Sequence, residues 1–271
     1  MLGAIIGDVA GSRFEFRNRL SKDFTFFTPE CEFTDDTVMT CAVALALTAS
    51  KEDWSDLPEQ AVAAMQGVGR RFPNCGYGAR FIRWMFTDDP EPYGSCGNGS
   101  AMRVSPVGFA AKDVGEAKKL AAAVTCVSHD HPEGLKGAEA TAVAIVLARQ
   151  GKTKEEIRAA MEEYYDLGTT VDEYRAQWSG HGREICQVSV PQALACFLEG
   201  ESFEDVIRNC ISIGGDSDTI AAIAGGIAEA YFGIPDEIRE KVLAFLPDSL
   251  QEICRQFSQR FAYAFPPGDS P

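Results

Sequence analysis

Basic residues are scarce in this sequence. Its 271 residues include 25 lysines and arginines against 40 aspartates and glutamates, so the formal net charge is −15. A chain without a basic face cannot displace counterions from a polyanion, which argues against nucleic acid or an anionic membrane as a partner. A small phosphate-bearing ligand remains compatible with this charge if backbone amides, helix N-termini or metal ions hold it.

Long hydrophobic runs are missing as well. The apolar residues 1–6 are soon followed by Asp8 and lack a basic flank, so we expect neither a membrane span nor a signal peptide. The nine cysteines form no CxxC pair, and several lie inside apolar stretches, which favours reduced, buried thiols over disulfides or a zinc ribbon. These features together predict a soluble, cytoplasmic protein.

Strand patterns are nearly absent, whereas helical patterns are frequent. Three segments are apolar on all sides, which predicts buried helices: residues 38–49, 134–149 and 220–231. Further helix starts are predicted by capping-box spacings and by helix-opening residues: Thr153 with Glu156, Ser202 with Asp205, Pro235, and Asp248. We therefore expect a single compact all-α domain over residues 1–271, with about ten or more helices and a frayed tail at residues 265–271.

Two acidic turns stand directly before two of the apolar segments. The first reads TDDT over residues 34–37, and the second reads GGDSDT over residues 214–219. Helix capping accounts for one polar side chain at each helix start, but two carboxylates entering a buried helix are costly unless something neutralises them. If the turns meet, four carboxylates converge: Asp35, Asp36, Asp216 and Asp218. Two divalent cations would balance that charge, and oxygen ligands without histidine or thiolate favour Mg²⁺ or Mn²⁺.

The second turn must also be compared with the phosphatase signature D-x-D-x-T. Thr219 comes one position too early for that signature. The signature should also follow a parallel strand, and residues 211–213 are too short to form one. We reject this alternative.

A third segment is rich in small residues and runs from Gly94 to Arg103 as GSCGNGSAMR. Three glycines within six positions let a backbone approach a ligand closely, although a turn without a ligand is the plainer interpretation. His129 belongs to a His-Asp-His sequence, but only three histidines occur in the chain, which disfavours zinc. Two roles remain open for His129: contact with a substrate in a cleft, and a purely structural role. Glu15 follows a glycine-containing stretch and by itself would be interpreted as solvated.

Taken in this order, these segments resemble the ADP-ribosylglycohydrolase family, which includes the dinitrogenase reductase-activating glycohydrolases and their eukaryotic relatives. The matching landmarks are Gly7-Asp8 with Gly11-Ser12, Glu15, the TDDT turn, GNGSAMR at 97–103, Ser128-His129, and the GGDSDT turn. They span residues 3–219, and the flanking apolar helices extend the likeness to about Pro235. The pair of acidic turns at this separation is highly specific, whereas the glycine-rich segment alone is not.

The resemblance implies an all-α, orthogonal multi-helix fold with two Mg²⁺ ions, or Mn²⁺, in a cleft between the acidic turns. It implies six metal ligands: Thr34, Asp35, Asp36, Asp216, Asp218 and Thr219. It implies eight substrate contacts: Asp35, Gly94, Ser95, Cys96, Gly97, Asn98, Gly99 and His129. Glu15 matches a catalytic glutamate on a mobile loop that closes over the distal ribose.

Two departures from the family pattern concern the substrate. Cys96 stands where relatives often carry an aromatic residue, which puts stacking at that position in doubt. Residues 177–184 differ from the usual pattern in a region that borders the adenine side of the cleft in relatives.

The implied reaction is hydrolysis of the glycosidic or ester bond between ADP-ribose and a protein or small-molecule acceptor, with ADP-ribose as product. Glycosidic cleavage passes through an oxocarbenium-like transition state, the metals would orient the ribose and activate water, and Glu15 would order water or move a proton. A non-catalytic ADP-ribose-binding relative and a two-metal phosphoesterase are the alternatives. The presence of every implied ligand and of Glu15 favours the enzyme. The acceptor, whether arginine, serine, a nucleobase or an acetyl ester, stays open.

Overall fold

A computed structural model describes residues 1–179 and 183–263, and within these residues the regular elements are all helices. In chain order the α-helices are α1 (Leu2–Gly11), α2 (Asp35–Ala49), α3 (Leu57–Gly69), α4 (Ala79–Phe86), α5 (Gly99–Met102), α6 (Ser105–Ala110), α7 (Val114–Thr125), α8 (Pro132–Arg149), α9 (Lys154–Met161), α10 (Val171–Gln177), α11 (Cys186–Glu199), α12 (Phe203–Ser212), α13 (Ser217–Phe232), α14 (Asp236–Leu243) and α15 (Asp248–Phe261). A 3₁₀ helix, η1 (Ser12–Phe14), follows α1. The all-α prediction is confirmed, and the tail at 265–271 lies outside the described residues.

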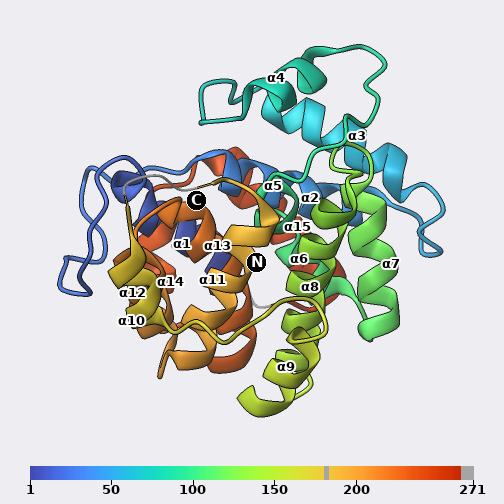
Figure 1. Ribbon diagram of the computed structural model, residues 1–271. Helices are drawn as coiled ribbons and strands as arrows, with labels where there is room; N and C mark the ends of the chain where they lie inside the picture. Colours follow the sequence, from blue (N-terminus) through green and yellow to red (C-terminus); the bar gives the residue numbers. More distant parts are fainter. Residues whose placement is uncertain (180–182, 264–271) are drawn as a thin grey trace.

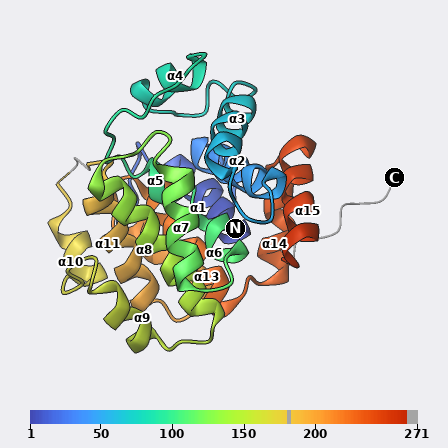
Figure 2. The same cartoon turned by 90° about the vertical axis from the view of Figure 1, so that its right-hand side faces the viewer.

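The three apolar segments form buried helices, as the sequence predicts. Residues 38–49 lie in α2, 134–149 in α8 and 220–231 in α13, and most of their side chains are buried. Helix α13 lies at the centre of the molecule, where α1, α8, α11 and α12 pack around it (Figures 1 and 2). Because the start of α13 carries the second acidic turn, this packing sets the turn in the middle of the fold.

The predicted helix starts are found close to their expected positions. Thr153 forms a complete capping box with Glu156 at the start of α9. At α12 the Ser202 hydroxyl accepts from the Asp205 amide, but the Asp205 carboxylate accepts from the Glu201 amide instead of returning to Ser202. The reciprocal half of that box is therefore missing, because the Asp205 carboxylate accepts from the residue before the N-cap and not from the N-cap itself. Helices α14 and α15 begin at Asp236 and Asp248.

Three glycines spaced four residues apart let α1 approach α13 at backbone distance. A Cβ placed on Gly3 would lie 2.2 Å from the Gly225 carbonyl oxygen, and one on Gly7 would lie 2.1 Å from that of Ala221. At the end of the helix, a Cβ on Gly11 would lie 2.5 Å from the Asp218 Cα. The close contact sets the segment that follows α1, including Glu15, beside the start of α13.

Within the described part of the chain, no helix has both the length and the apolar character that a membrane span requires. All nine cysteines are free thiols, and six of them are buried. The Sγ atoms of Cys41 and Cys254 lie 3.9 Å apart where α2 packs against α15. The buried thiols thus act as small apolar side chains in the core.

Candidate functional site

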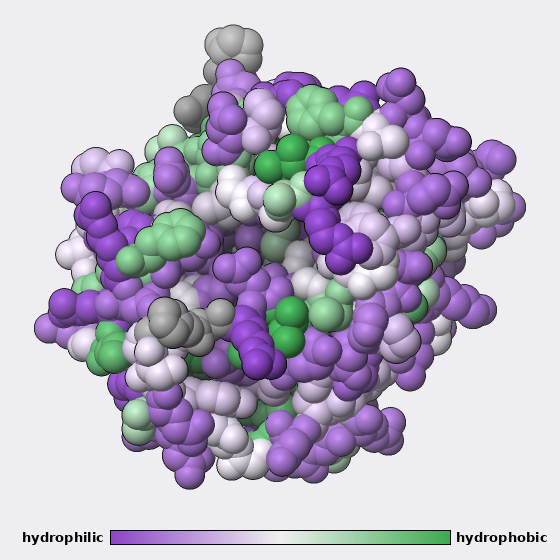
Figure 3. All heavy atoms as spheres, turned by 45° about the horizontal axis from the view of Figure 1, so that its top comes forward, coloured by the Kyte–Doolittle hydropathy of each residue, from purple (hydrophilic) through white to green (hydrophobic). Residues whose placement is uncertain are grey.

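A cleft of about 710 Å³ opens where the starts of α2 and α13 face the segments around α4 and α5. Figure 3, in which the top of Figure 1 is tilted toward the viewer, shows a hollow in a mostly hydrophilic surface. The volume is in the range of pockets that hold a nucleotide-sized ligand. Most of the residues selected from the sequence line this cleft: Glu15, Thr34, Asp35, Asp36, Ser95, Gly97, Asn98, Gly99, His129, Asp216, Asp218 and Thr219.

The two acidic turns meet in the cleft. The Thr219 hydroxyl donates a hydrogen bond to Asp36 Oδ2 at 3.0 Å, across 183 positions of the chain. The sequence predicts that the acidic residues lie on the turns before the helices, whereas Asp35, Asp36 and Asp218 lie in the first turns of α2 and α13. They still reach the cleft, because side chains in a helix tilt toward its N-terminus.

The GGDSDT turn needs its two glycines for backbone reasons. Gly214 and Gly215 have φ values of +75° and +83°, in the left-handed region that other residues rarely adopt. The Trp178 ring packs against both glycines: a Cβ placed on Gly214 would lie 3.0 Å from it, which is a tight contact, and one on Gly215 would lie 3.5 Å away. Two successive left-handed residues turn the chain sharply and deliver Asp216 to the N-cap of α13.

Asp8 organises the first turn and was not selected from the sequence as a site residue. Its carboxylate, fully buried in α1, accepts hydrogen bonds from the Thr34 amide (2.9 Å), the Thr34 hydroxyl (2.7 Å) and the Thr37 amide (3.0 Å). Burial raises the pKa of Asp8 to about 6, against the effect of these hydrogen bonds. The signal that could have revealed this role is a single aspartate inside the otherwise apolar helix of residues 2–11.

The neighbouring carboxylates repel one another. Burial, followed by the charges of nearby aspartates, raises the pKa of Asp35, Asp36 and Asp218 well above the ordinary value. Asp36 Oδ1 and Asp218 Oδ1 are buried without a hydrogen-bond partner. A buried carboxylate oxygen in that state is costly unless a cation or a proton reaches it.

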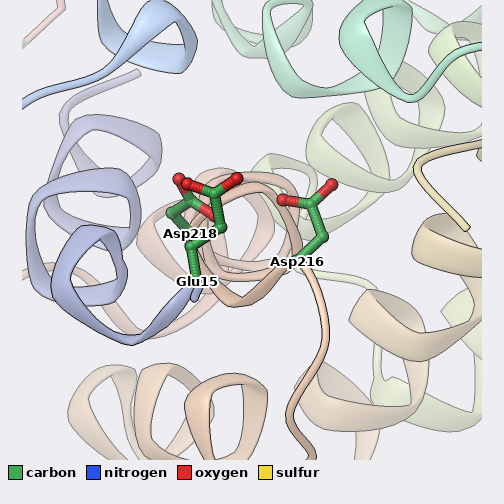
Figure 4. A group of neighbouring side chains, drawn as sticks. All are labelled: Glu15, Asp216 and Asp218. Atoms are coloured by element: carbon green, nitrogen blue, oxygen red, sulfur yellow. The ribbon is translucent and has the colours of Figure 1, made fainter. Parts of the chain in front are cut away.

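Glu15 extends into the same cluster from the segment after η1. One carboxylate oxygen each from Glu15, Asp216 and Asp218 lie within 4.8 Å of one another. Figure 4 shows these three side chains with their carboxylates pointing to the same side of the N-terminal end of α13. Burial, and then the charge of Asp216, raises the pKa of Glu15 to about 7.

Asn18 ties the Glu15 segment to the second acidic turn. Its side-chain amide donates to the carbonyl oxygens of Phe14 (2.8 Å), Glu15 (3.0 Å) and Gly215 (3.0 Å). Glu15 is thereby held at the cluster through its own backbone, while its carboxylate remains half-buried. No pattern in the sequence indicates this contact, because it joins residues 197 positions apart.

The donor set fits hard divalent cations. Its members are carboxylate and hydroxyl oxygens, which Mg²⁺, Mn²⁺ and Ca²⁺ prefer. Thr34 Oγ1 gives its proton to Asp8 and accepts from the Asp36 amide, so one lone pair of this oxygen remains for a ligand. Thr219 Oγ1 gives its proton to Asp36 and keeps two lone pairs. Cations would also provide a partner for Asp36 Oδ1 and Asp218 Oδ1, the two buried carboxylate oxygens without a hydrogen bond.

The glycine-rich segment borders the cleft, but several of its amides are already used. The Gly97 amide donates to Ser95 Oγ at 3.1 Å, and the Asn98 amide donates to the Glu184 carbonyl at 3.2 Å. The Asn98 side chain donates to Asp216 Oδ2 at 2.6 Å and so orients that carboxylate. The segment therefore supports the acidic cluster in addition to facing a ligand.

Two of the residues chosen from this segment lie outside the cleft lining. The Gly94 amide donates to Asp130 Oδ1 at 2.6 Å, and the carbonyl of Cys96 accepts from the Cys186 amide at 3.0 Å. Gly94 adopts a φ of +64°. Both residues serve the shape of the segment, and the predicted ligand contacts from them stay predictions.

His129 lines the cleft beside the glycine-rich segment and is 5% exposed. Its Nδ1 is 2.9 Å from Ser128 Oγ, and its ring lies 5.7 Å from that of Tyr93 and 6.2 Å from that of Phe81. Burial, followed by the charges of Arg103 and Arg80, lowers the pKa of His129 well below the ordinary value. The imidazole is therefore neutral at physiological pH.

Several lining residues were not selected from the sequence. Aromatic rings of Phe16, Phe33, Phe81 and Tyr93 line the cleft, together with Arg103 and Glu184. Tyr93, directly before the glycine-rich segment, offers an aromatic surface that Cys96 cannot. Within the divergent stretch 177–184, residues 180–182 lie outside the described part of the chain. Glu184, at the end of this stretch, lies beside the cleft, and its pKa is raised by burial and then by the charge of Asp216.

Comparison with known proteins identifies one family. A family model described as ADP-ribosylglycohydrolase matches residues 1–266. The chain is 27% identical over 334 residues to "ADP-ribosylhydrolase ARH3" from Mus musculus, covering 96% of this chain and 87% of that protein. It is 26% identical over 272 residues to "ADP-ribosylarginine hydrolase Tri1" from Pseudomonas putida, covering 89% of this chain and 72% of that protein. A solved structure titled "ADP-ribosylglycohydrolase-related protein complex" shares the fold, with a TM-score of 0.69, 23% identity and 95% of each chain covered.

Proposed function

The chain belongs to the ADP-ribosylglycohydrolase family, and from this premise we propose that it is a Mg²⁺-dependent hydrolase that releases ADP-ribose from a modified acceptor. The family match over nearly the whole chain supports the hydrolysis of an ADP-ribose linkage. The acceptor is a protein or small molecule that carries the ADP-ribosyl group. Relatives named as ADP-ribosylarginine hydrolase and as ADP-ribosylhydrolase make arginine and other acceptors the classes to test.

The observation that carries the proposal is the acidic cluster beside a cleft of nucleotide size. The cleft holds about 710 Å³ and is lined by both acidic turns, by Glu15 and by the glycine-rich segment. Two buried carboxylate oxygens in the cluster lack partners. Such an arrangement is unfavourable in a purely structural role, because the same positions filled with apolar residues would fold at lower cost.

We propose two Mg²⁺ ions, with Mn²⁺ as the substitute, as the cofactor. The ligands would be Thr34, Asp35, Asp36, Asp216, Asp218 and Thr219. When bound, such ions would supply Lewis-acid polarisation and a positive charge against which ribose hydroxyls and water are oriented. Asp8 would act behind them, because it fixes the Thr34 hydroxyl and the start of α2.

The remaining residues would position the substrate and handle protons. Glu15, held at the cluster by Asn18, would take or give a proton at the bond being cleaved or order the attacking water. Gly97, Asn98 and Gly99 would allow the ADP-ribosyl diphosphate and ribose to approach the wall that carries His129. Tyr93 and Phe33 would supply aromatic surface for the base.

A product assay tests the proposal. The protein is incubated with a panel of ADP-ribosylated arginine, serine, nucleobase and acetyl-ester acceptors, with Mg²⁺ or with EDTA, and the products are identified by mass spectrometry. We expect ADP-ribose and the free acceptor from at least one substrate, only with the metal. AMP and a ribose-phosphate fragment would instead identify a phosphoesterase, and binding of ADP-ribose without turnover would identify a non-catalytic relative.

We also propose that the protein works in a reducing, cytoplasmic setting. The support is the chemistry of its cysteines, since nine free thiols include six that are buried in the core. Fractionation of the source cells, followed by detection of the chain, tests this setting.

A further inference from the structure

Arg103 is an unusual member of the cleft wall, because it is a cation buried almost completely. Only 1% of it is exposed, and its Nη2 donates to two neutral oxygens, Ser128 Oγ at 2.8 Å and the Val124 carbonyl at 3.4 Å. The guanidinium carbon lies 5.6 Å from the centre of the Phe81 ring. Burial lowers the pKa of Arg103 to about 10, which leaves it protonated at neutral pH.

The contact between Arg103 and Ser128 determines where the serine proton goes. A guanidinium has only donors, so Ser128 Oγ must accept the bond from Arg103. The other partner of this oxygen is Nδ1 of His129, at 2.9 Å. If that nitrogen carried a proton, the hydroxyl would accept twice, and its own proton would be buried without an acceptor. That arrangement is disfavoured by about tenfold or more.

The neutral imidazole of His129 therefore carries its proton on Nε2. This nitrogen faces the glycine-rich segment, since a Cβ placed on Gly99 would lie 3.3 Å from it and one on Gly97 would lie 3.6 Å away. The two glycines thus keep the space in front of Nε2 open. His129 also lines the cleft, and because Ser128 engages Nδ1, Nε2 is the ring nitrogen that is available to a ligand atom.

We propose that Arg103 and Ser128 are positioning residues, which hold His129 as a fixed, uncharged hydrogen-bond donor for one oxygen of the bound ADP-ribosyl group. The choice of this ligand rests on the proposed function. The chain of hydrogen bonds from Arg103 through Ser128 to His129, called the relay below, does not depend on it. A phosphate or ribose oxygen meets the requirement, because both accept a hydrogen bond from a neutral N–H.

Nitrogen NMR of histidine tests the relay without any assay of activity. The chain has three histidines, so a sample labelled with ¹⁵N-histidine gives few signals, and His129→Gln assigns those of His129. At pH 7.5 we expect Nε2 to resonate as a protonated nitrogen and Nδ1 as an unprotonated one. Addition of ADP-ribose should shift the Nε2 signal. A proton on Nδ1, or on both nitrogens, would overturn the proposal, as would an Nε2 signal that saturating ADP-ribose leaves unmoved.

Variants separate the relay from simple packing. Ser128→Ala removes the hydroxyl, so both tautomers of His129 should appear and ADP-ribose should bind about three- to tenfold more weakly, whereas Ser128→Thr should restore both properties. Ser105→Ala is the matched control, because Ser105 is also buried and its hydroxyl lacks a partner. Arg103→Met should mix the tautomers with Ser128 and His129 intact. An unchanged tautomer and affinity in Ser128→Ala would refute the relay.

The outcomes also separate this inference from the proposed function. If the protein hydrolyses an ADP-ribosylated substrate while His129 carries its proton on Nδ1, the proposed function stands and the relay is rejected. If His129 carries its proton on Nε2 but the protein neither binds ADP-ribose nor hydrolyses any member of the panel, the relay is supported and ADP-ribose is rejected as its ligand.

Discussion

Replacement of Asp218 by asparagine should make the metal-free protein more stable and the enzyme inactive. Asp218 is 3% exposed, and its Oδ1 has no hydrogen-bond partner. One of its oxygens lies within 4.8 Å of carboxylate oxygens of Glu15 and Asp216. Asp218→Asn keeps the shape of the side chain and removes the charge, so in the absence of cations it relieves repulsion.

The magnitude follows from the distances in the cluster. Two full charges at the upper limit of 4.8 Å repel by about 3 kcal/mol at an effective dielectric constant of about 20. Partial protonation, and solvent at the half-buried Glu15 and Asp216, reduce the net gain to about 1–2 kcal/mol. In a domain of this size, that gain raises the melting temperature by about 2–8 °C.

Differential scanning fluorimetry at pH 8 measures this effect. In EDTA, Asp218→Asn should melt above the wild type, while Asp88→Asn, at an exposed aspartate between α4 and α5, should not. In Mg²⁺ the order should reverse, because the wild type gains about 2.7 kcal/mol at a hundredfold excess over the dissociation constant. A fall in the melting temperature of metal-free Asp218→Asn, as large as that from a core truncation, would refute the repulsion on which the metal site is argued.

Four further outcomes follow from the same cluster. Glu15→Gln should reduce turnover by about 10²-fold or more while Mg²⁺ still raises the melting temperature; loss of that response in calorimetry would make Glu15 a metal ligand. Asn18→Ala should lower kcat more than it raises KM, because it frees the backbone of Glu15, and equal kinetics to wild type would reject Asn18 as a tether. Gly97→Val should weaken ADP-ribose binding in calorimetry, since even its Cβ would lie 3.2 Å from Ser95 Oγ, and unchanged affinity would return the segment to a structural role. In EDTA, the contribution of Asp8 to stability should fall as the pH rises from 4 to 7, because its pKa is raised to about 6 in the folded state; the stability of Asp8→Asn relative to wild type should therefore increase by about 2.4 kcal/mol between pH 4 and pH 7, and a constant difference in urea unfolding curves would contradict this.

The sequence predicts the parts of the fold that depend on local pattern. Residues 38–49, 134–149 and 220–231 are mostly apolar, and most of their side chains are buried in α2, α8 and α13. Side-chain caps at Thr153 and Ser202 have short-range signatures and were found at the same residues. The stripe of Gly3, Gly7 and Gly11 is visible in the sequence, but only the structure shows that it faces α13.

The candidate site is predicted less completely, because much of it depends on contacts between distant segments. The acidic turns were recognisable, since paired carboxylates before an apolar helix are rare without a neutralising partner. Asp8 and Asn18 act through hydrogen bonds to residues that the chain brings close only on folding. Arg103 lies within a recognised motif, yet its effect on His129 passes through Ser128 and requires atomic positions.

The central claim is that the acidic cluster binds Mg²⁺ and so releases intact ADP-ribose from a modified acceptor. The most direct measurement is product identification by mass spectrometry for the best substrate of the panel, with wild type and Asp218→Asn compared in Mg²⁺ and in EDTA. The account predicts ADP-ribose and an unmodified acceptor from the wild type in Mg²⁺, and neither product in the other three reactions. Equal yields of ADP-ribose in EDTA, or from Asp218→Asn, would contradict it.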